Sequence, residues 1–159
     1  MSAVSIDKID IAILAQLQED ASPSVAEIAQ RVNLSQNACW RRIRRLEEDG
    51  VILRRVALLD PEKLDAGMTV FVSVRTAEHS AAWLDEFARA VSELPEVVEF
   101  YRMAGEIDYL LKVRVADIKA YDRVYKRLIE RVRLVDVSAA FAMEEIKNST
   151  AIPLSCLSR

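Results

Sequence analysis

The sequence predicts an α+β protein in which a helical N-terminal part precedes a part that alternates strands and helices. Apolar residues recur at helical spacing from Ile6 to Leu46, and apolar and polar residues alternate in several stretches after residue 67. Between these regions, Asp60 and Pro61 interrupt the apolar pattern. The 159 residues therefore divide into an expected domain at 1–60 and a second domain at 61–159.

Two helices are expected before residue 33. Apolar side chains at helical spacing after Ser5 predict a first helix over residues 6–19. A second helix is expected to begin after Ser24, because Glu27 stands three residues later and the pair forms a capping-box signature. These helices would share one small core with a third helix.

A tight turn and this third helix follow. Asn33 stands where the chain must turn, and asparagine tolerates a left-handed backbone better than most residues. Ser35 is placed to cap the next helix, and Gly50 is placed to end it. Two helices joined by so short a turn predict a helix-turn-helix, in which the second helix enters the major groove of DNA.

The third helix has an apolar face and a basic face. At about 100° per residue, Cys39, Ile43 and Leu46 fall on one side. The opposite side carries Asn37, Arg41, Arg44 and, at its edges, Trp40 and Arg45. Arginine offers paired donors to guanine, asparagine offers an amide to adenine, and flanking cations suit phosphates. A solvated basic face is the alternative interpretation, but the capped helix before it and the apolar segment after it favour DNA reading.

Charge is distributed unevenly along the chain. The net charge of −3 and the pI near 5.3 argue weakly against a nucleic-acid partner. Residues 31–46 nevertheless hold five arginines and no acidic residue. Apolar residues on both sides of Arg54 and Arg55 predict a wing or hinge strand beside the phosphate backbone. The residues expected to contact double-stranded DNA are Arg31, Ser35, Gln36, Asn37, Trp40, Arg41, Arg42, Arg44, Arg45, Arg54 and Arg55.

The second part follows the order βαββαβ. Strands are expected over residues 68–75, 97–103, 109–115 and 135–143, with helices over 83–94 and, capped by Asp117, from 118 onward. The apolar residues expected to be buried by the second of these helices are Ile118, Tyr121, Tyr125 and Leu128. This order is the ferredoxin-like arrangement, in which both helices cover one face of an antiparallel sheet. The other face, with Phe71 and Ala140, is apolar and predicts a homodimer.

Strings along nearly the whole chain resemble the Lrp/AsnC family of transcription factors. They include NLS at 33–35, ALLDP at 57–61, AGEIDYLL at 104–111 and MEEIK at 143–147. The resemblance implies an amino-acid-sensing second domain, dimers that assemble into tetramers or octamers, and an effector site near the glycine turn. Cys39-Trp40, and His79-Ser80 with Trp83, further resemble the cysteine-responsive, DecR-like subgroup.

The turn at Gly105 also suits an amino acid on chemical grounds. Its N–H groups would receive the carboxylate while Asp108 pairs with the ammonium; in the alternative, Asp108 is only a turn residue bonded to backbone. The residues expected to bind the effector are Met103, Ala104, Gly105, Glu106, Ile107, Asp108, Tyr109 and Ser138. L-cysteine is the first expected effector, and another sulfur-containing or aliphatic amino acid is the second.

The residue inventory argues against an enzyme. Three glycines cannot form a phosphate-binding loop, and the single histidine, His79, has no acid at a spacing typical of a catalytic site. Cys39 and Cys156 lack metal-site spacing, so neither metal nor cofactor is expected. Without a leader or a membrane span, a cytoplasmic location is expected. We expect a sequence-specific transcriptional regulator; an architectural nucleoid protein and a stand-alone amino-acid-binding module are the alternatives.

Overall fold

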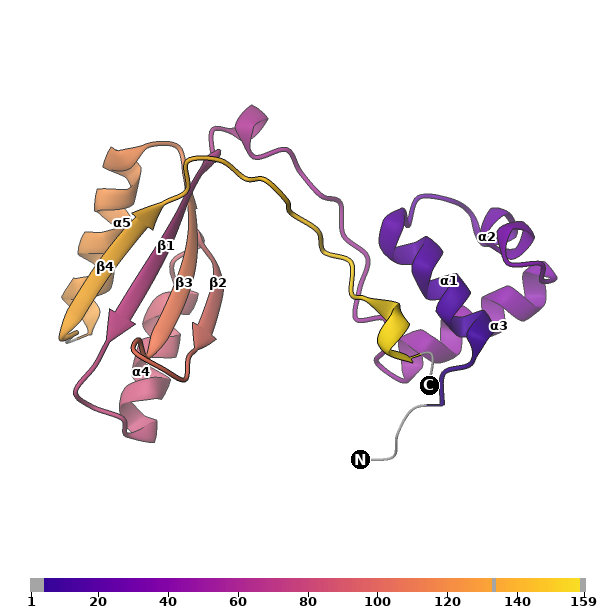
Figure 1. The fold of residues 1–159 in the computed structure, drawn as a ribbon, viewed down its shortest axis with the longest axis horizontal. Helices are drawn as coiled ribbons and strands as arrows, with labels where there is room; N and C mark the ends of the chain where they lie inside the picture. Colours follow the sequence, from indigo (N-terminus) through magenta and orange to yellow (C-terminus); the bar gives the residue numbers. More distant parts are fainter. Residues whose placement is uncertain (1–4, 133, 158–159) are drawn as a thin grey trace. The chain divides into compact units, whose positions relative to one another are not determined.

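The computed structural model describes residues 5–132 and 134–157, which form two compact units (Figure 1). The first unit comprises the residues up to Leu58 together with those from Lys147 onward, and the second comprises Leu59–Ile146. The sequence predicts that every residue after 60 belongs to the second domain. The C-terminal segment instead belongs with the helices at the start of the chain.

The C-terminal segment is held by the first helix, α1 (Lys8–Glu19). The side-chain amide of Gln18 donates a hydrogen bond to the carbonyl of Ile152 at 3.1 Å and accepts one from its N–H at 3.0 Å. The short 3-10 helix η2 (Leu154–Leu157) follows and contacts α1. A contact between residues so distant in sequence leaves no local signal, which explains why the sequence did not predict it.

Helix α1 begins two residues later than predicted. The carboxylate of Asp7 accepts hydrogen bonds from the N–H groups of Ile9 at 2.9 Å and Asp10 at 2.8 Å. The carboxylate of Asp10 accepts in turn from the N–H of Asp7 at 3.1 Å. This reciprocal capping box satisfies the free donors of the first turn, so the helix starts after Asp7.

The predicted helix-turn-helix is confirmed in its local detail. Helices α2 (Val25–Arg31) and α3 (Gln36–Glu48) are capped by Ser24 and Ser35, respectively. Glu27 completes the capping box of α2, with its carboxylate 2.7 Å from the N–H of Ser24. Asn33 adopts the left-handed backbone with φ 55°, and Gly50 ends the segment after α3 with φ 71°.

The three helices share one core. Its fully buried members are Ile13 from α1, Ile28 and Ala29 from α2, and Cys39 and Ile43 from α3. Leu46 is also buried, so the predicted apolar face of α3 is confirmed. Burial raises the pKa of the Cys39 thiol, because the apolar surroundings disfavour its thiolate.

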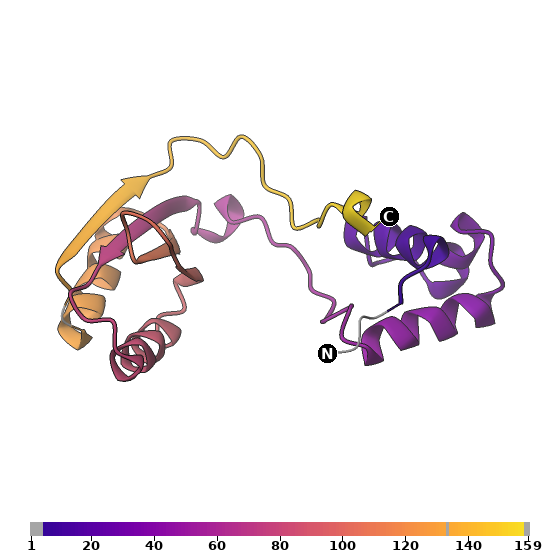
Figure 2. The same ribbon diagram turned by 60° about the horizontal axis from the view of Figure 1, so that its bottom comes forward.

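The predicted wing or hinge strand is absent from the structure. Residues 53–60 are extended without a strand partner, and Figure 2 draws them as coil. Apolar side chains in this hinge, Leu53, Val56, Leu58 and Leu59, are each more than 60% exposed. A strand needs a neighbouring segment that pairs with its backbone N–H and C=O groups, and none of the described residues pairs with this segment in that way.

The second unit is a four-stranded antiparallel sheet with two helices. The elements along the chain are β1 (Met68–Arg75), α4 (Ala81–Ser92), β2 (Val97–Arg102), β3 (Tyr109–Val115), α5 (Ile118–Arg131) and β4 (Asp136–Phe141). The strand order is β2-β3-β1-β4, with Val72 of β1 opposite Leu111 of β3 and Ala139 of β4. The predicted βαββαβ order is confirmed, although β4 is shorter at both ends than residues 135–143.

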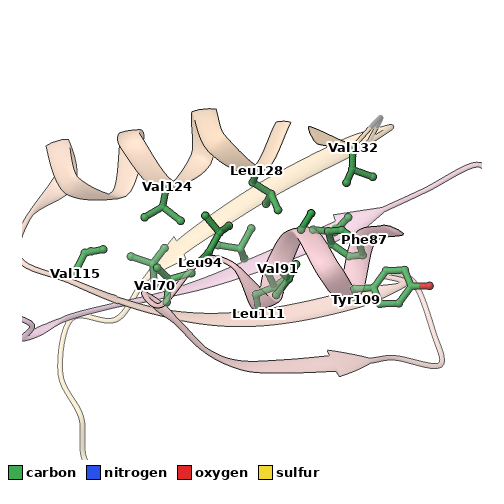
Figure 3. Close-up of a cluster of buried hydrophobic side chains, with 14 of the residues drawn as sticks. Val70, Phe87, Val91, Leu94, Tyr109, Leu111, Val115, Val124, Leu128 and Val132 are labelled. Carbon is green, nitrogen blue, oxygen red and sulfur yellow. The ribbon is translucent and has the colours of Figure 1, made fainter. Parts of the chain in front are cut away.

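Both helices cover the same face of this sheet, as the alternation in β1 and β3 predicts. The core joins strand residues with Phe87, Val91 and Leu94 from α4 and its C-terminal end, and with Val124 and Leu128 from α5 (Figure 3). The expectation that Ile118 is buried is wrong: this side chain lies in the first turn of α5 and is 64% exposed. Leu128 is buried as expected, Tyr121 and Tyr125 are half-buried, and Val124, which the sequence did not single out, is buried beside Leu128.

The cap of α1 should make the stability of the first unit depend on pH. The pKa of Asp7 is lowered from 3.8 to about 2, because the N–H of Asp10 and then the guanidinium of Arg42 favour the charged carboxylate. A group whose pKa is lower in the folded state stabilises that state above its unfolded pKa, and this contribution disappears as pH falls through the folded value. Asp7→Asn keeps a capping oxygen but removes the charge.

We therefore expect Asp7→Asn to melt at a lower temperature than the parent protein at pH 7. The difference should shrink between pH 3.8 and about 2. Thermal denaturation followed by circular dichroism measures it, and a difference that stays constant down to pH 2 would contradict the assignment.

Candidate DNA-reading face and effector turn

The face of α3 opposite the core is exposed and basic. It carries Asn37, Trp40, Arg41 and Arg44, which the helical periodicity predicts for this face, and Gln36, which the sequence predicts as a DNA contact. The indole of Trp40 is 54% exposed, which is unusual for so large an apolar group. Arg44 lies 3.3 Å from Glu48 on the same helix, whereas Arg41 makes no ion pair with any residue that the structure describes.

Arg42 and Arg45 lie on a different flank of α3, against α1. The guanidinium of Arg42 is 2.7 Å from the carboxylate of Asp7 and 2.8 Å from that of Asp10. The guanidinium of Arg45 is 2.5 Å from the second oxygen of Asp10. The sequence predicts both arginines as DNA contacts; in the structure they have acidic partners within the first unit.

The other expected DNA contacts are spread over the first unit. Arg31, at the end of α2, donates to the side chain of Gln16 at 3.2 Å. Ser35 uses its hydroxyl to cap α3. In the hinge, Arg55 pairs with Glu47 at 3.0 Å, while Arg54 is exposed and unpaired within the described residues.

The turn between β2 and β3 is exposed and open to a ligand. Gly105 has φ 144°, a backbone conformation that glycine alone adopts readily. Among the described residues, no partner accepts from the N–H groups of Ala104, Gly105, Glu106 or Ile107. Successive free N–H groups in a turn suit an anion such as a carboxylate. Met103, at the start of the turn, is 39% exposed.

Asp108 ties this turn to the loop that follows β1. One carboxylate oxygen accepts from the N–H of Thr76 at 2.8 Å, and the N–H of Asp108 donates to the carbonyl of Val74 at 3.0 Å. The other carboxylate oxygen lies 4.0 Å from Nδ1 of His79. Sequence spacing gave His79 no acidic neighbour, but the fold brings Asp108 beside it. The bond to Thr76 crosses between strands, so Asp108 is more than a turn residue bonded to its own segment.

Two of the expected effector residues lie away from the turn. Tyr109 is buried among Trp83, Phe87 and Phe100, with ring centroids between 5.2 and 5.7 Å apart. Ser138 lies on β4, which pairs with β1 rather than with β3. Within one chain the turn from Met103 to Asp108 is therefore the compact part of the predicted site.

The face of the sheet opposite the helices carries both apolar and charged side chains, and Phe71 of β1 lies opposite Lys112 of β3. Phe71 and Tyr101 are 38% and 49% exposed there. Lys112 pairs with Glu99 at 3.0 Å, and Tyr101 donates to the same carboxylate at 2.8 Å. This hydrogen bond raises the pKa of Tyr101. Partial burial raises the pKa of Glu99, but hydrogen bonds from Lys112 and Tyr101 outweigh it and lower the pKa.

Neither a metal site nor a membrane span was found in the part of the chain that the structure describes. No group of three or more potential ligands gathers among the described histidines, cysteines and carboxylates. No described helix is both long and apolar enough to cross a bilayer.

Comparisons with known proteins match both units. Residues 6–52 match a winged helix-turn-helix DNA-binding model, and residues 69–152 match the Lrp/AsnC ligand binding domain. The glutamate uptake regulatory protein of Zymomonas mobilis is 60% identical over 94% of this chain and 91% of its own length. The DNA-binding transcriptional activator DecR of Escherichia coli is 51% identical over 94% of this chain and 99% of its own.

Solved structures agree with these sequence relationships. An AsnC family transcriptional regulator from Agrobacterium tumefaciens is 58% identical, with a TM-score of 0.93 over 96% of this chain and 99% of its own. A transcriptional regulator from Neisseria meningitidis, solved in complex with L-methionine, is 34% identical, with a TM-score of 0.91 over the same shares.

Proposed function

Because the chain belongs to the Lrp/AsnC family of transcriptional regulators, we propose that it reads DNA through the outward face of α3 and adjusts this binding to a small amino acid. The observation that carries the proposal is the exposed group of Asn37, Trp40, Arg41 and Arg44 on the second helix of a helix-turn-helix. Asn37 and Arg41 suit base edges, whereas Arg31, Arg54 and Arg55 suit phosphates.

We propose a homodimer formed through the open face of the sheet, with dimers assembling further. When helices cover one face of a sheet and the other face is apolar and exposed, a partner normally covers that second face. Phe71 on the inner strand β1, with Ala140 on β4 and Tyr101 on β2, would supply the apolar contact. A dimer also carries two copies of α3, and two half-sites give far higher affinity than one.

We propose that the effector is a small amino acid bound at the turn from Met103 to Asp108. The N–H groups of Gly105 and its neighbours, which have no acceptor among the described residues, suit the carboxylate, and the oxygen of Asp108 nearer His79 suits the ammonium. L-cysteine is the first candidate because of the sequence resemblance to the cysteine-responsive subgroup, and another sulfur-containing amino acid is the second, since the Neisseria regulator was solved with L-methionine. Tyr109 and Ser138 would contribute only indirectly or through another subunit.

We propose a regulator without catalytic activity that works in the cytoplasm, where bacterial DNA lies. The closest approach to a catalytic pair is His79 with Asp108, and no nucleophile among the described residues completes it. An architectural protein would bind DNA without a preferred site, so a measured preference separates the two functions.

Arg41 and Arg54 provide a matched pair for testing the reading face, because both are exposed and neither forms an ion pair within the described residues. Arg41→Ala should cost about 1–3 kcal/mol at a site selected from random DNA, and little on random DNA itself. Arg54→Ala should weaken both, and should flatten the salt dependence by roughly 0.9 of a unit. Fluorescence anisotropy at several salt concentrations measures both effects. Equal losses on both DNAs for Arg41→Ala would show that the face is wrongly assigned.

Phe71→Glu tests the proposed dimer. A charge at the centre of an apolar interface is costly to bury, so this variant should be monomeric at micromolar concentration while the parent protein is dimeric or larger. Ile118→Glu is the control, because Ile118 is also exposed but lies on the helical side of the second unit. Analytical ultracentrifugation gives the masses. A monomeric parent protein, or equal dissociation by both substitutions, would rule out this interface.

Asp108→Asn tests the effector site without removing the acceptor for Thr76, since an amide oxygen replaces the carboxylate oxygen. Losing a charge-assisted hydrogen bond should weaken amino-acid binding about tenfold or more. Calorimetry with L-cysteine, L-methionine and L-leucine on the parent protein, Asp108→Asn and the distant control Glu130→Gln measures this. Equal affinity in all three proteins would remove Asp108 from the site, and no heat with any amino acid would leave the regulator without this sensor.

A further inference from the structure

The carboxylate of Asp10 lies fully buried between two helices of the DNA-binding unit. Its side chain has no exposed surface, and three groups donate to it: the N–H of Asp7, the guanidinium of Arg42 and the guanidinium of Arg45. A buried carboxylate is costly unless it is paired and hydrogen-bonded on both oxygens. Asp10 meets this condition only when α3 lies in one orientation, because both guanidiniums come from that helix.

The arginine run of α3 is divided between two faces by this contact. Ile43 enters the core between two arginine pairs, and each pair has one outward member and one member bound to Asp10. The outward members are Arg41 and Arg44, and the bound members are Arg42 and Arg45. Arg42 and Arg45 are therefore paired within the protein before DNA binds, Arg44 lies 3.3 Å from Glu48, and Arg41 has no acidic partner among the described residues.

Directional bonds constrain α3 more tightly than its apolar contacts do. Ile43 and its buried neighbours fix which side of the helix faces the core, but apolar contact has no preferred direction. The two bonds to Asp10 come from successive turns of α3 and end on one immobile carboxylate. They resist both rotation of α3 about its axis and sliding along α1. Each position on a helix faces a fixed direction, about 100° from that of the next residue. A rotation of α3 about its axis would therefore turn Arg41 away from the base edge that it faces.

We propose that Asp10 is a positioning residue for sequence reading, which keeps Arg42 and Arg45 off the DNA phosphates and fixes the direction in which Arg41 and Asn37 face the bases. This inference rests on the proposed reading face. If so, Asp10 lowers the affinity for random DNA and raises the discrimination between a selected site and random DNA. The reason is that counterion release depends on cations that are free to contact phosphates.

The experiment measures how Arg45 contributes to DNA binding with and without the buried charge. Arg45→Gln and Asp10→Asn are made singly and together, with Arg54→Gln as the matched control for an unpaired cation. Anisotropy gives the affinity for a random-sequence duplex and for a site selected with the parent protein, over a range of potassium chloride concentrations. Thermal melting reports whether each variant folds.

With Asp10 present, Arg45→Gln should leave the salt slope on random DNA near that of the parent protein, while Arg54→Gln should flatten it by roughly 0.9 of a unit. Asp10→Asn should steepen the slope by a similar amount, and adding Arg45→Gln should reverse that change. The ratio of selected-site to random affinity should fall about tenfold in Asp10→Asn, as for one lost base contact.

Two results would overturn the inference. Arg45→Gln could flatten the slope as much as Arg54→Gln, which would make Arg45 an ordinary phosphate contact. Asp10→Asn could weaken selected and random DNA equally with an unchanged slope, which would reduce Asp10 to a structural residue. If Asp10→Asn does not melt cooperatively, the comparison of Arg45→Gln with Arg54→Gln decides alone. Failure of the proposed function is a separate outcome, in which the parent protein itself shows no preferred site.

Discussion

The two-residue alternation in β1 and β3 is the constraint on which the rest of the second unit depends. Valine and leucine at alternate positions occupy one face of the sheet, and α4 and α5 pack against that face. The residues between them, including Phe71 and Leu110, point to the face opposite α4 and α5. In the proposed homodimer a second copy covers this face, and the dimer then brings two copies of α3 to one duplex.

Charge pairing across the first unit decides which cations are free. Residues 31–46 contain arginines and no acidic residue. The acidic residues that pair with arginines of this segment are Asp7 and Asp10, at the start of α1. Glu47 likewise forms an ion pair with Arg55. The basic face is therefore narrower than the sequence suggests, and its free cations are few. A narrow face limits affinity for random DNA in a protein of net charge −3.

The turn from Met103 to Asp108 combines a rigid base with open donors. Asp108 bonds the loop after β1 through Thr76, while Gly105 and its neighbours keep free N–H groups among the described residues. For the proposed effector site, donors that are already held in place would reduce the conformational freedom lost when a ligand binds. Any effect of that ligand on DNA requires that it prefer one assembly or conformation over another.

The sequence by itself determined the local structure, including the caps at Ser24, Ser35 and Asp117, the left-handed turn at Asn33, and the strands of the βαββαβ sheet. These features are encoded within a few residues, because caps, turns and periodicity depend on near neighbours. Only the tertiary structure decided the contacts between distant residues. Asp10 meets Arg42 and Arg45 across 32 and 35 residues, Thr76 meets Asp108 across 32, and Gln18 meets Ile152 across 134. In the tertiary structure the apolar hinge also has no strand partner among the described residues. Backbone pairing needs a second segment, and the local pattern of residues does not indicate which segment that is.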